Sequence, residues 1–105
     1  MKKLLIAIII VIAFMVLGCQ PPEDGVYSVI YHGNGSTSGF PPTDSNEYTT
    51  GMEATILGKH TLEKEDHTFL IWNTKADGTG NSYTEDQKIT INYSTVFLYA
   101  QWKED

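Results

Sequence analysis

The 105-residue chain carries 13 acidic residues against 7 lysines and no arginine, which gives a formal net charge of −6 at pH 7. A chain of this length forms one small domain, so its core depends on a few large aromatic side chains. The acidic balance argues against a nucleic-acid partner and against anionic lipid headgroups, because clustered lysine and arginine bind both of these.

Residues 1–18 have the three parts of a secretory signal peptide. Lys2 and Lys3 come first, an uncharged apolar run over residues 4–17 follows, and the small residue Gly18 precedes Cys19. The apolar run has 14 residues, fewer than the roughly 20 that cross a bilayer core. Cys19 is the one cysteine of the chain, so it has no partner for an internal disulfide.

The tetrapeptide Val16-Leu17-Gly18-Cys19 resembles the lipobox of bacterial lipoproteins. The resemblance implies cleavage before Cys19, a diacylglycerol on its thiol and a fatty acyl group on the new amino terminus, with no other cofactor. Two or three acyl chains anchor a protein stably in a membrane, whereas one chain binds reversibly. The alternative interpretation is an uncleaved anchor helix with an incidental cysteine.

Residues 19–25 comprise the lipidated cysteine and a tether that Pro21 and Pro22 keep extended. The expected location is extracytoplasmic, with the chain anchored by lipid to the cell membrane or to an outer membrane. Gln20 permits an outer-membrane destination because it is not aspartate. The domain then faces either the cell surface or the periplasm. Without Lys2 and Lys3, five lysines remain against 13 acids, so the mature charge is −8.

The domain begins with predicted β-structure. Residues 26–31 are rich in β-branched and aromatic residues and end at a His-Gly-Asn-Gly turn. Residues 33–51 form a long connection made mostly of Gly, Ser, Thr, Pro, Asn and Asp. Residues 53–57 predict a short strand, and residues 61–66 are the one stretch that could hold a turn of helix.

Three further strands are predicted in the second half of the chain. Residues 67–73 form the first, and an Asp-Gly-Thr-Gly-Asn turn at 77–81 follows it. Residues 88–92 alternate apolar and polar side chains, and residues 95–102 give the strongest strand signal. The expected fold is therefore mainly β, with α+β as the upper limit.

Alternation along the last predicted strand separates two faces. The face expected in the core holds Val96, Leu98, Ala100 and Trp102. The other face holds Phe97, Tyr99 and Gln101. A sheet with little helix has one poorly covered side, and aromatic residues suit interfaces. The candidate binding surface therefore comprises Tyr27, Tyr31, Phe97 and Tyr99. The alternative is that these side chains complete the core, where Trp72 and Trp102 are also expected.

Two motifs resemble those of the Listeria–Bacteroides repeat, the module also found as the B repeat of internalin B. The run FLIWNTKADGTGNSY at 69–83 is similar to the family's Phe-x-Gly-Trp-Asn-Thr-x-x-Asp-Gly-x-Gly-x-x-Tyr, and LYAQW at 98–102 is similar to its closing motif. The Gly-Asn-Gly at 33–35 and the Pro-Pro-Thr-Asp at 41–44 agree as well. The chain departs from the pattern at Asp66-His67 and at Ile71, where the family usually has Gly-Tyr and Gly.

The resemblance implies a small β-grasp-like single sheet over residues 26–102, with a reduced or absent helix, and 103–105 as a C-terminal tail. It also implies an extracytoplasmic module associated with adhesion, spacing or protein contact, and it does not imply an enzyme. The expected function is thus a non-enzymatic envelope lipoprotein whose domain binds a protein or a glycan. The alternative is a structural spacer without a dedicated ligand.

Residue spacing argues against metal sites. A calcium loop that starts at Asn73 would place Lys75 in the third ligand position and Thr84 in the twelfth, where a glutamate is required. The three histidines, His32, His60 and His67, lack the close spacing of zinc ligands, and no cysteine joins them. The sequence also lacks a recognisable nucleophile with its base. We therefore expect no metal and no catalytic residues.

Overall fold

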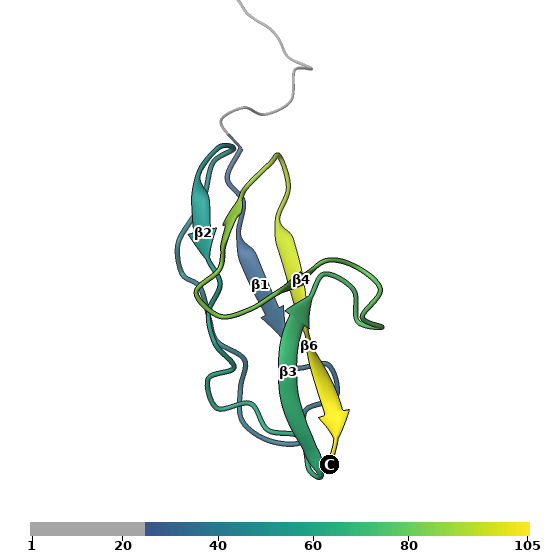
Figure 1. Ribbon diagram of the computed structural model, residues 1–105. Helices are drawn as coiled ribbons and strands as arrows, with labels where there is room; N and C mark the ends of the chain where they lie inside the picture. The colour runs from purple at the N-terminus through teal and green to yellow at the C-terminus, as the bar shows by residue number, and fades with distance from the viewer. Residues whose placement is uncertain (1–24) are drawn as a thin grey trace, which may run out of the picture.

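The computed structural model describes residues 25–105, which form six strands and no helix (Figure 1). The strands are β1 (Val29–His32), β2 (Glu53–Thr55), β3 (His67–Asn73), β4 (Ser82–Tyr83), β5 (Lys88–Thr90) and β6 (Val96–Glu104). Within this range no helix is long and apolar enough to cross a membrane. The predicted signal peptide and the predicted lipidation at Cys19 lie outside the described residues.

The strands form two sheets. The larger has the order β1-β6-β3-β4, in which β1 pairs parallel with β6 while β3 pairs antiparallel with both β6 and β4. The smaller is the antiparallel pair β2-β5. The prediction of a mainly β fold is confirmed, but the sequence suggested one sheet. The possible helix at 61–66 is also absent, because Glu63 pairs there with Ser38 in an isolated bridge.

Two of the three strands predicted in the second half of the chain match the observed bounds closely, whereas β5 ends at Thr90 and not at residue 92, and β4 was not predicted. β3 has the predicted bounds, and β6 continues two residues past Trp102 because Lys103 and Glu104 pair with the start of β3. β1 begins at Val29, later than predicted. Tyr27 instead forms an isolated antiparallel bridge with Tyr48, with N···O distances of 2.8 and 2.9 Å.

The core centres on Trp72, which is fully buried. Its ring contacts those of Tyr31 and Phe69 edge to face, at centroid distances of 4.8 and 5.1 Å. Leu98 and Ala100 of β6 are buried as predicted. Their neighbours on the same face, Val96 and Trp102, are half-buried and pack against the core from its margins.

A bulge in β3 changes which side chains reach the outer face of the sheet. Phe69 is opposite Trp102 and Trp72 is opposite Ala100, so one extra residue lies between the two pairs. Phe69 and Trp72 both contact the core. Leu70 points away from the core because it follows Phe69, and Ile71 points away because it precedes Trp72; the bulge lies between them. Leu70 and Ile71 therefore both lie on the outer face, where Leu70 is 55% exposed.

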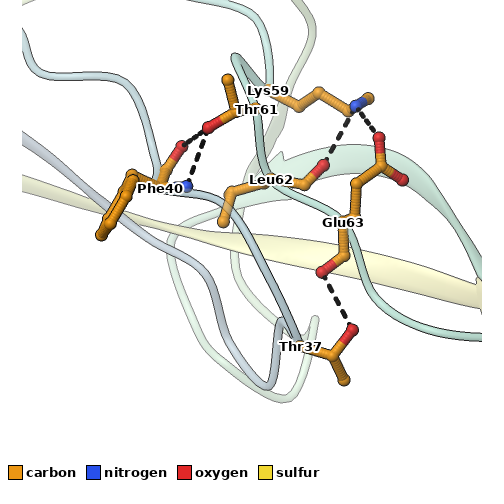
Figure 2. A network of polar contacts seen from close by, with 6 residues as sticks. All are labelled: Thr37, Phe40, Lys59, Thr61, Leu62 and Glu63. Atoms are coloured by element: carbon orange, nitrogen blue, oxygen red, sulfur yellow. Dashed lines mark hydrogen bonds and ion pairs between the residues drawn. The ribbon is translucent and has the colours of Figure 1, made fainter.

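The long connection after β1 is held by contacts with residues 59–63 (Figure 2). The Thr61 hydroxyl accepts the backbone N–H of Phe40 at 2.9 Å and donates to its carbonyl at 3.3 Å. Gly39 has a φ of +76°, and a Cβ at that position would clash with the Thr61 carbonyl oxygen. Only glycine allows this close approach, so the connection is fixed even though it has no regular strand.

Candidate functional site

Four side chains gather on the outer face of the larger sheet, which we call the outer-face patch. It comprises Ile30, His32, Phe97 and Tyr99. In the β1–β6 register, Ile30 lies opposite Phe97, and His32 lies opposite Tyr99. The His32 ring stacks on Tyr99 with centroids 4.8 Å apart and an interplanar angle of 14°, and on Phe97 at 6.1 Å and 20°.

The outer-face patch has two exposed side chains and two half-buried ones. Phe97 is 47% exposed and Ile30 is 38% exposed, whereas His32 and Tyr99 are half-buried. A shallow hollow beside Tyr99 is lined by Thr74, Lys75, Ala76 and Asp77. The patch thus combines exposed apolar area with ring positions that stacking fixes.

The loop after β3 lies beside the outer-face patch, next to Tyr99. Gln101 donates from Nε2 to the Lys75 carbonyl at 3.2 Å. Asn34 donates from Nδ2 to the carbonyls of Ala76 at 2.9 Å and Ala100 at 2.7 Å. These bonds hold the loop against β6 and the turn after β1.

The structure brings two of the four predicted aromatic residues together on the outer-face patch and places the other two elsewhere. Phe97 and Tyr99 belong to the patch. Tyr31 does not, because it is 5% exposed and its neighbour Ile30 takes the outward position on β1. Tyr27 is half-buried and packs against the core. Tyr31 was expected on the binding surface, but it is a core residue.

Sequence reasoning missed Ile30 and His32. The signal was present in the alternation of residues 28–32, where Val29 and Tyr31 share one face and Ile30 and His32 share the other. It became informative only with the parallel pairing of β1 and β6, which places His32 beside Tyr99. That pairing joins segments more than 60 residues apart in the sequence, so no local sequence pattern predicts it.

The Asn-Thr-x-x-Asp-Gly run is a self-contained turn built around the Asn73 side chain. Its amide donates to the carbonyls of Gly78 and Gly80 at 3.3 and 3.2 Å and to the Ser82 hydroxyl at 2.9 Å. Its Oδ1 accepts the backbone N–H groups of Lys75 and Gly80, each at 2.9 Å. Asn73 is 1% exposed, so these partners explain why a polar residue occupies a buried position.

Asp77 is satisfied within the same turn. The Thr79 hydroxyl and the Thr79 backbone N–H donate to its Oδ1 at 2.7 and 3.1 Å. These two hydrogen bonds, the hydroxyl first, lower the pKa of the Asp77 carboxyl from its ordinary value. The motif that resembles a cation loop is therefore organised by its own hydrogen bonds.

The three histidines lie apart along the fold. His32 is on β1, His60 is in a loop with a φ of +58°, and His67 opens β3. Across residues 25–105, no group of three or more His, Cys, Asp or Glu side chains is arranged to hold a metal ion.

The comparisons with known proteins agree with the sequence motifs. The model of the Listeria-Bacteroides repeat domain matches residues 27–101. A protein of Evansella cellulosilytica named "Putative membrane protein" is 38% identical over 76 residues, which cover 72% of this chain and 11% of that protein. Another from the same organism, named "Putative Gly-rich membrane protein", is 37% identical over 78 residues, covering 73% of this chain and 9% of that protein. The chain thus matches about a tenth of the length of these curated relatives. No solved structure matches it significantly.

Proposed function

This chain belongs to the Listeria-Bacteroides repeat family, and on that premise we propose that it is a non-enzymatic envelope lipoprotein that binds a protein partner through its outer-face patch. Its anchor is the lipid on Cys19, and its one repeat domain lies outside the cytoplasm. The two Evansella relatives are named as membrane proteins, which agrees with a membrane-associated chain.

The lipid anchor is supported by the order of features at the front of the chain. A positive start, an apolar run and a lipobox-like tetrapeptide come before Cys19, and the domain follows within a few residues. The family match begins at residue 27, so the segment before it is free to act as signal and anchor.

The observation that carries the binding proposal is the exposed Ile30–Phe97 pair beside the stacked His32 and Tyr99 rings. Aromatic residues are enriched at protein interfaces, and side chains that are already ordered lose little entropy on binding. The exposed part of the patch includes the aliphatic Ile30, and stacking already uses faces of the His32 and Tyr99 rings. A protein surface suits this arrangement better than a sugar ring, which needs a free aromatic face.

We also propose that the domain has no enzymatic activity. Side chains with a shifted pKa often mark catalytic sites. Among the described residues, the clear shifts fall on Tyr31 and Tyr48, which are buried, and on Asp77, whose partners belong to its own turn. None of these groups lies on the outer-face patch.

The alternative function is a spacer that holds other envelope components at a distance and has no dedicated ligand. In the two Evansella relatives, the matched segment occupies 11% and 9% of a much longer protein. A module of that relative size can serve as a structural unit between larger parts.

In-cell photo-crosslinking distinguishes the two functions. A benzophenone amino acid replaces Phe97 in the full chain, and a matched control replaces Phe40, another exposed aromatic residue (76%) outside the patch. A binding module gives a protein adduct of defined mass from position 97 and not from position 40. An added Ile30→Glu substitution should abolish that adduct.

The other outcomes oppose the proposal in different ways. Equal labelling from both positions, or none from either, supports the spacer. An adduct at position 97 that disappears after glycosidase treatment identifies a glycan partner. Mass spectrometry of the mature chain tests the anchor separately, because lipidation adds acyl mass at Cys19 and Cys19→Ser removes it.

A further inference from the structure

Three exposed side chains gather at the end of the domain where the chain enters from the anchor, and we call this end the anchor-proximal tip. Val26, Met52 and Tyr93 are 53%, 45% and 53% exposed. Figure 1 shows the first described residues and the loops around residues 50 and 93 at the same end of the molecule, opposite the C-terminus.

Hydrogen bonds between the loops fix this arrangement. Tyr93 donates its backbone N–H to the Thr50 hydroxyl at 2.9 Å. Gly51 donates to the Ile91 carbonyl at 2.9 Å, and Ile91 donates to the Met52 carbonyl at 2.8 Å. Val26 precedes Tyr27, which pairs with Tyr48 just before the first of these loops. The tip is therefore a defined surface built from three segments.

The tip is held close to the membrane if Cys19 carries lipid, and to this extent the inference rests on the proposed function. Six peptide units connect Cys19 to Gly25, so even a fully extended tether reaches at most about 20 Å. The opposite end of the domain is beyond this reach, because the strands of the larger sheet run between the two ends (Figure 1). The tip is thus the part of the domain that the tether keeps nearest to the lipid surface.

The side chains of the tip indicate which type of membrane surface it can contact. Tyrosine is enriched at the membrane–water interface, where its ring lies among the headgroups and its hydroxyl reaches water. The segments that form the tip, 25–28, 47–53 and 91–95, contain Glu47 and Glu53 and no lysine. Acidic side chains without basic ones disfavour anionic headgroups and leave an uncharged or zwitterionic interface as the partner.

We propose that the anchor-proximal tip is a second membrane contact, in which Tyr93, Met52 and Val26 insert into the headgroup region of a neutral bilayer. The acyl chains hold the protein on the membrane, and the tip fixes the orientation of the domain. The larger sheet then stands upright, and its outer-face patch faces sideways, clear of the lipid.

A fluorescence-quenching experiment tests the tip directly. The full chain is reconstituted into phosphatidylcholine vesicles that contain a nitroxide-labelled lipid. A fluorophore is attached at Ser94→Cys, which leaves the three tip side chains intact, or at Glu65→Cys. Glu65 precedes the turn in which Asp66 accepts the backbone N–H of Asp105, so it marks the far end of the sheet. We expect strong quenching at position 94 and weak quenching at position 65.

A fluorophore at position 94 could be quenched merely because the tether keeps it near the membrane. A pair of variants therefore tests whether the tip side chains insert. Tyr93→Asn with Met52→Gln removes the ring and the thioether. Tyr93 has a φ of +59°, a conformation that asparagine adopts easily, so this change preserves the backbone. The matched control is Leu70→Gln, which removes a similarly exposed side chain (55%) from the outer face.

We expect the tip variant to lower the quenching at position 94 towards the level at position 65, and Leu70→Gln to leave it unchanged. Equal quenching at both positions, or quenching that the tip variant does not reduce, overturns the inference. Mass spectrometry of the same samples reports lipidation at Cys19. A lipidated chain with an unquenched tip therefore refutes the second contact alone, whereas an unlipidated chain refutes the anchor.

Discussion

Tyr31 and Trp72 contact each other edge to face, and both bind the backbone of the same residue, Leu57. The Leu57 N–H donates to the Tyr31 hydroxyl at 2.9 Å, and the Trp72 indole N–H donates to the Leu57 carbonyl at 2.8 Å. Leu57 follows β2, whereas Tyr31 and Trp72 belong to the larger sheet. Two core aromatic residues therefore join the segment after β2 to the larger sheet by hydrogen bonds as well as by packing.

Replacing Tyr31 by phenylalanine should remove one of these links without leaving a cavity. The Leu57 N–H then lacks its partner, so we expect the free energy of unfolding to fall by about 1–3 kcal/mol. Urea unfolding of the purified protein measures the change. Tyr27→Phe is the control, because no hydrogen bond joins the Tyr27 side chain to any described residue; a loss of equal size there would contradict this explanation.

Stability should fall at alkaline pH because of two buried tyrosines. Burial raises the pKa of Tyr31 above the ordinary value of about 10 for a tyrosine. Burial, followed by the hydrogen bond to the Asp44 carboxylate, raises the pKa of Tyr48 in the same direction. Above about pH 10 the unfolded chain loses protons that the folded protein retains, so the free energy of unfolding decreases with rising pH.

Below that range these two groups leave stability independent of pH, because both states hold the proton. Urea unfolding from neutral to strongly alkaline pH measures the effect, and tyrosinate absorbance follows the ionisation. Tyr31→Phe with Tyr48→Phe should flatten the alkaline decline. An unchanged slope in the double variant would show that other groups control it.

Two glycines with left-handed backbone conformations should respond differently to alanine. At Gly51, with a φ of +97°, a new Cβ meets nothing within 4 Å. Gly51→Ala should therefore cost only the conformational strain, about 1–2 kcal/mol. At Gly39 the Cβ would also meet the Thr61 carbonyl, so Gly39→Ala should destabilise the protein clearly more. Thermal or urea unfolding compares the two, and equal losses would mean that the contact with Thr61 relaxes easily.

Asn73 should be essential for the turn that follows β3. Asn73→Ala leaves partly buried backbone groups of Lys75, Gly78 and Gly80 without their side-chain partner, so we expect the free energy of unfolding to fall by about 1–3 kcal/mol. Limited proteolysis should also detect earlier cleavage in residues 74–81. Asn81→Ala is the matched control, since Asn81 is exposed and no described hydrogen bond uses its side chain. Added calcium should not rescue Asn73→Ala; a rescue would contradict the view that the motif is structural.

The sequence was sufficient for the parts of the fold that local patterns determine. The alternation in residues 95–102 identified Leu98 and Ala100 as core residues, and β3 has the predicted bounds. The glycine-rich turn after β3 was also placed correctly, but its purpose was not evident, because the contacts of Asn73 depend on the three-dimensional path of the loop.

The outer-face patch could be predicted only in part. Phe97 and Tyr99 followed from alternation on one strand, whereas Ile30 and His32 required knowledge of the parallel β1–β6 pairing. Tyr31 was misplaced because a tyrosine can occupy a surface or, as here, bury its ring and satisfy its hydroxyl with a backbone N–H. The separation of β2 and β5 into a second sheet has a similar cause, since it depends on partners distant in sequence.

The position of β6 between β1 and β3 has a consequence for how the protein is made. β6 is the last strand of the domain to be synthesised, yet it supplies the pairing partner for the first strand, β1, and for β3. Such distant pairing folds slowly and cannot begin before its final segment is present. The nascent domain therefore remains without its main sheet until translation reaches the end of the repeat, because β1 and β3 have no common partner before β6 is made.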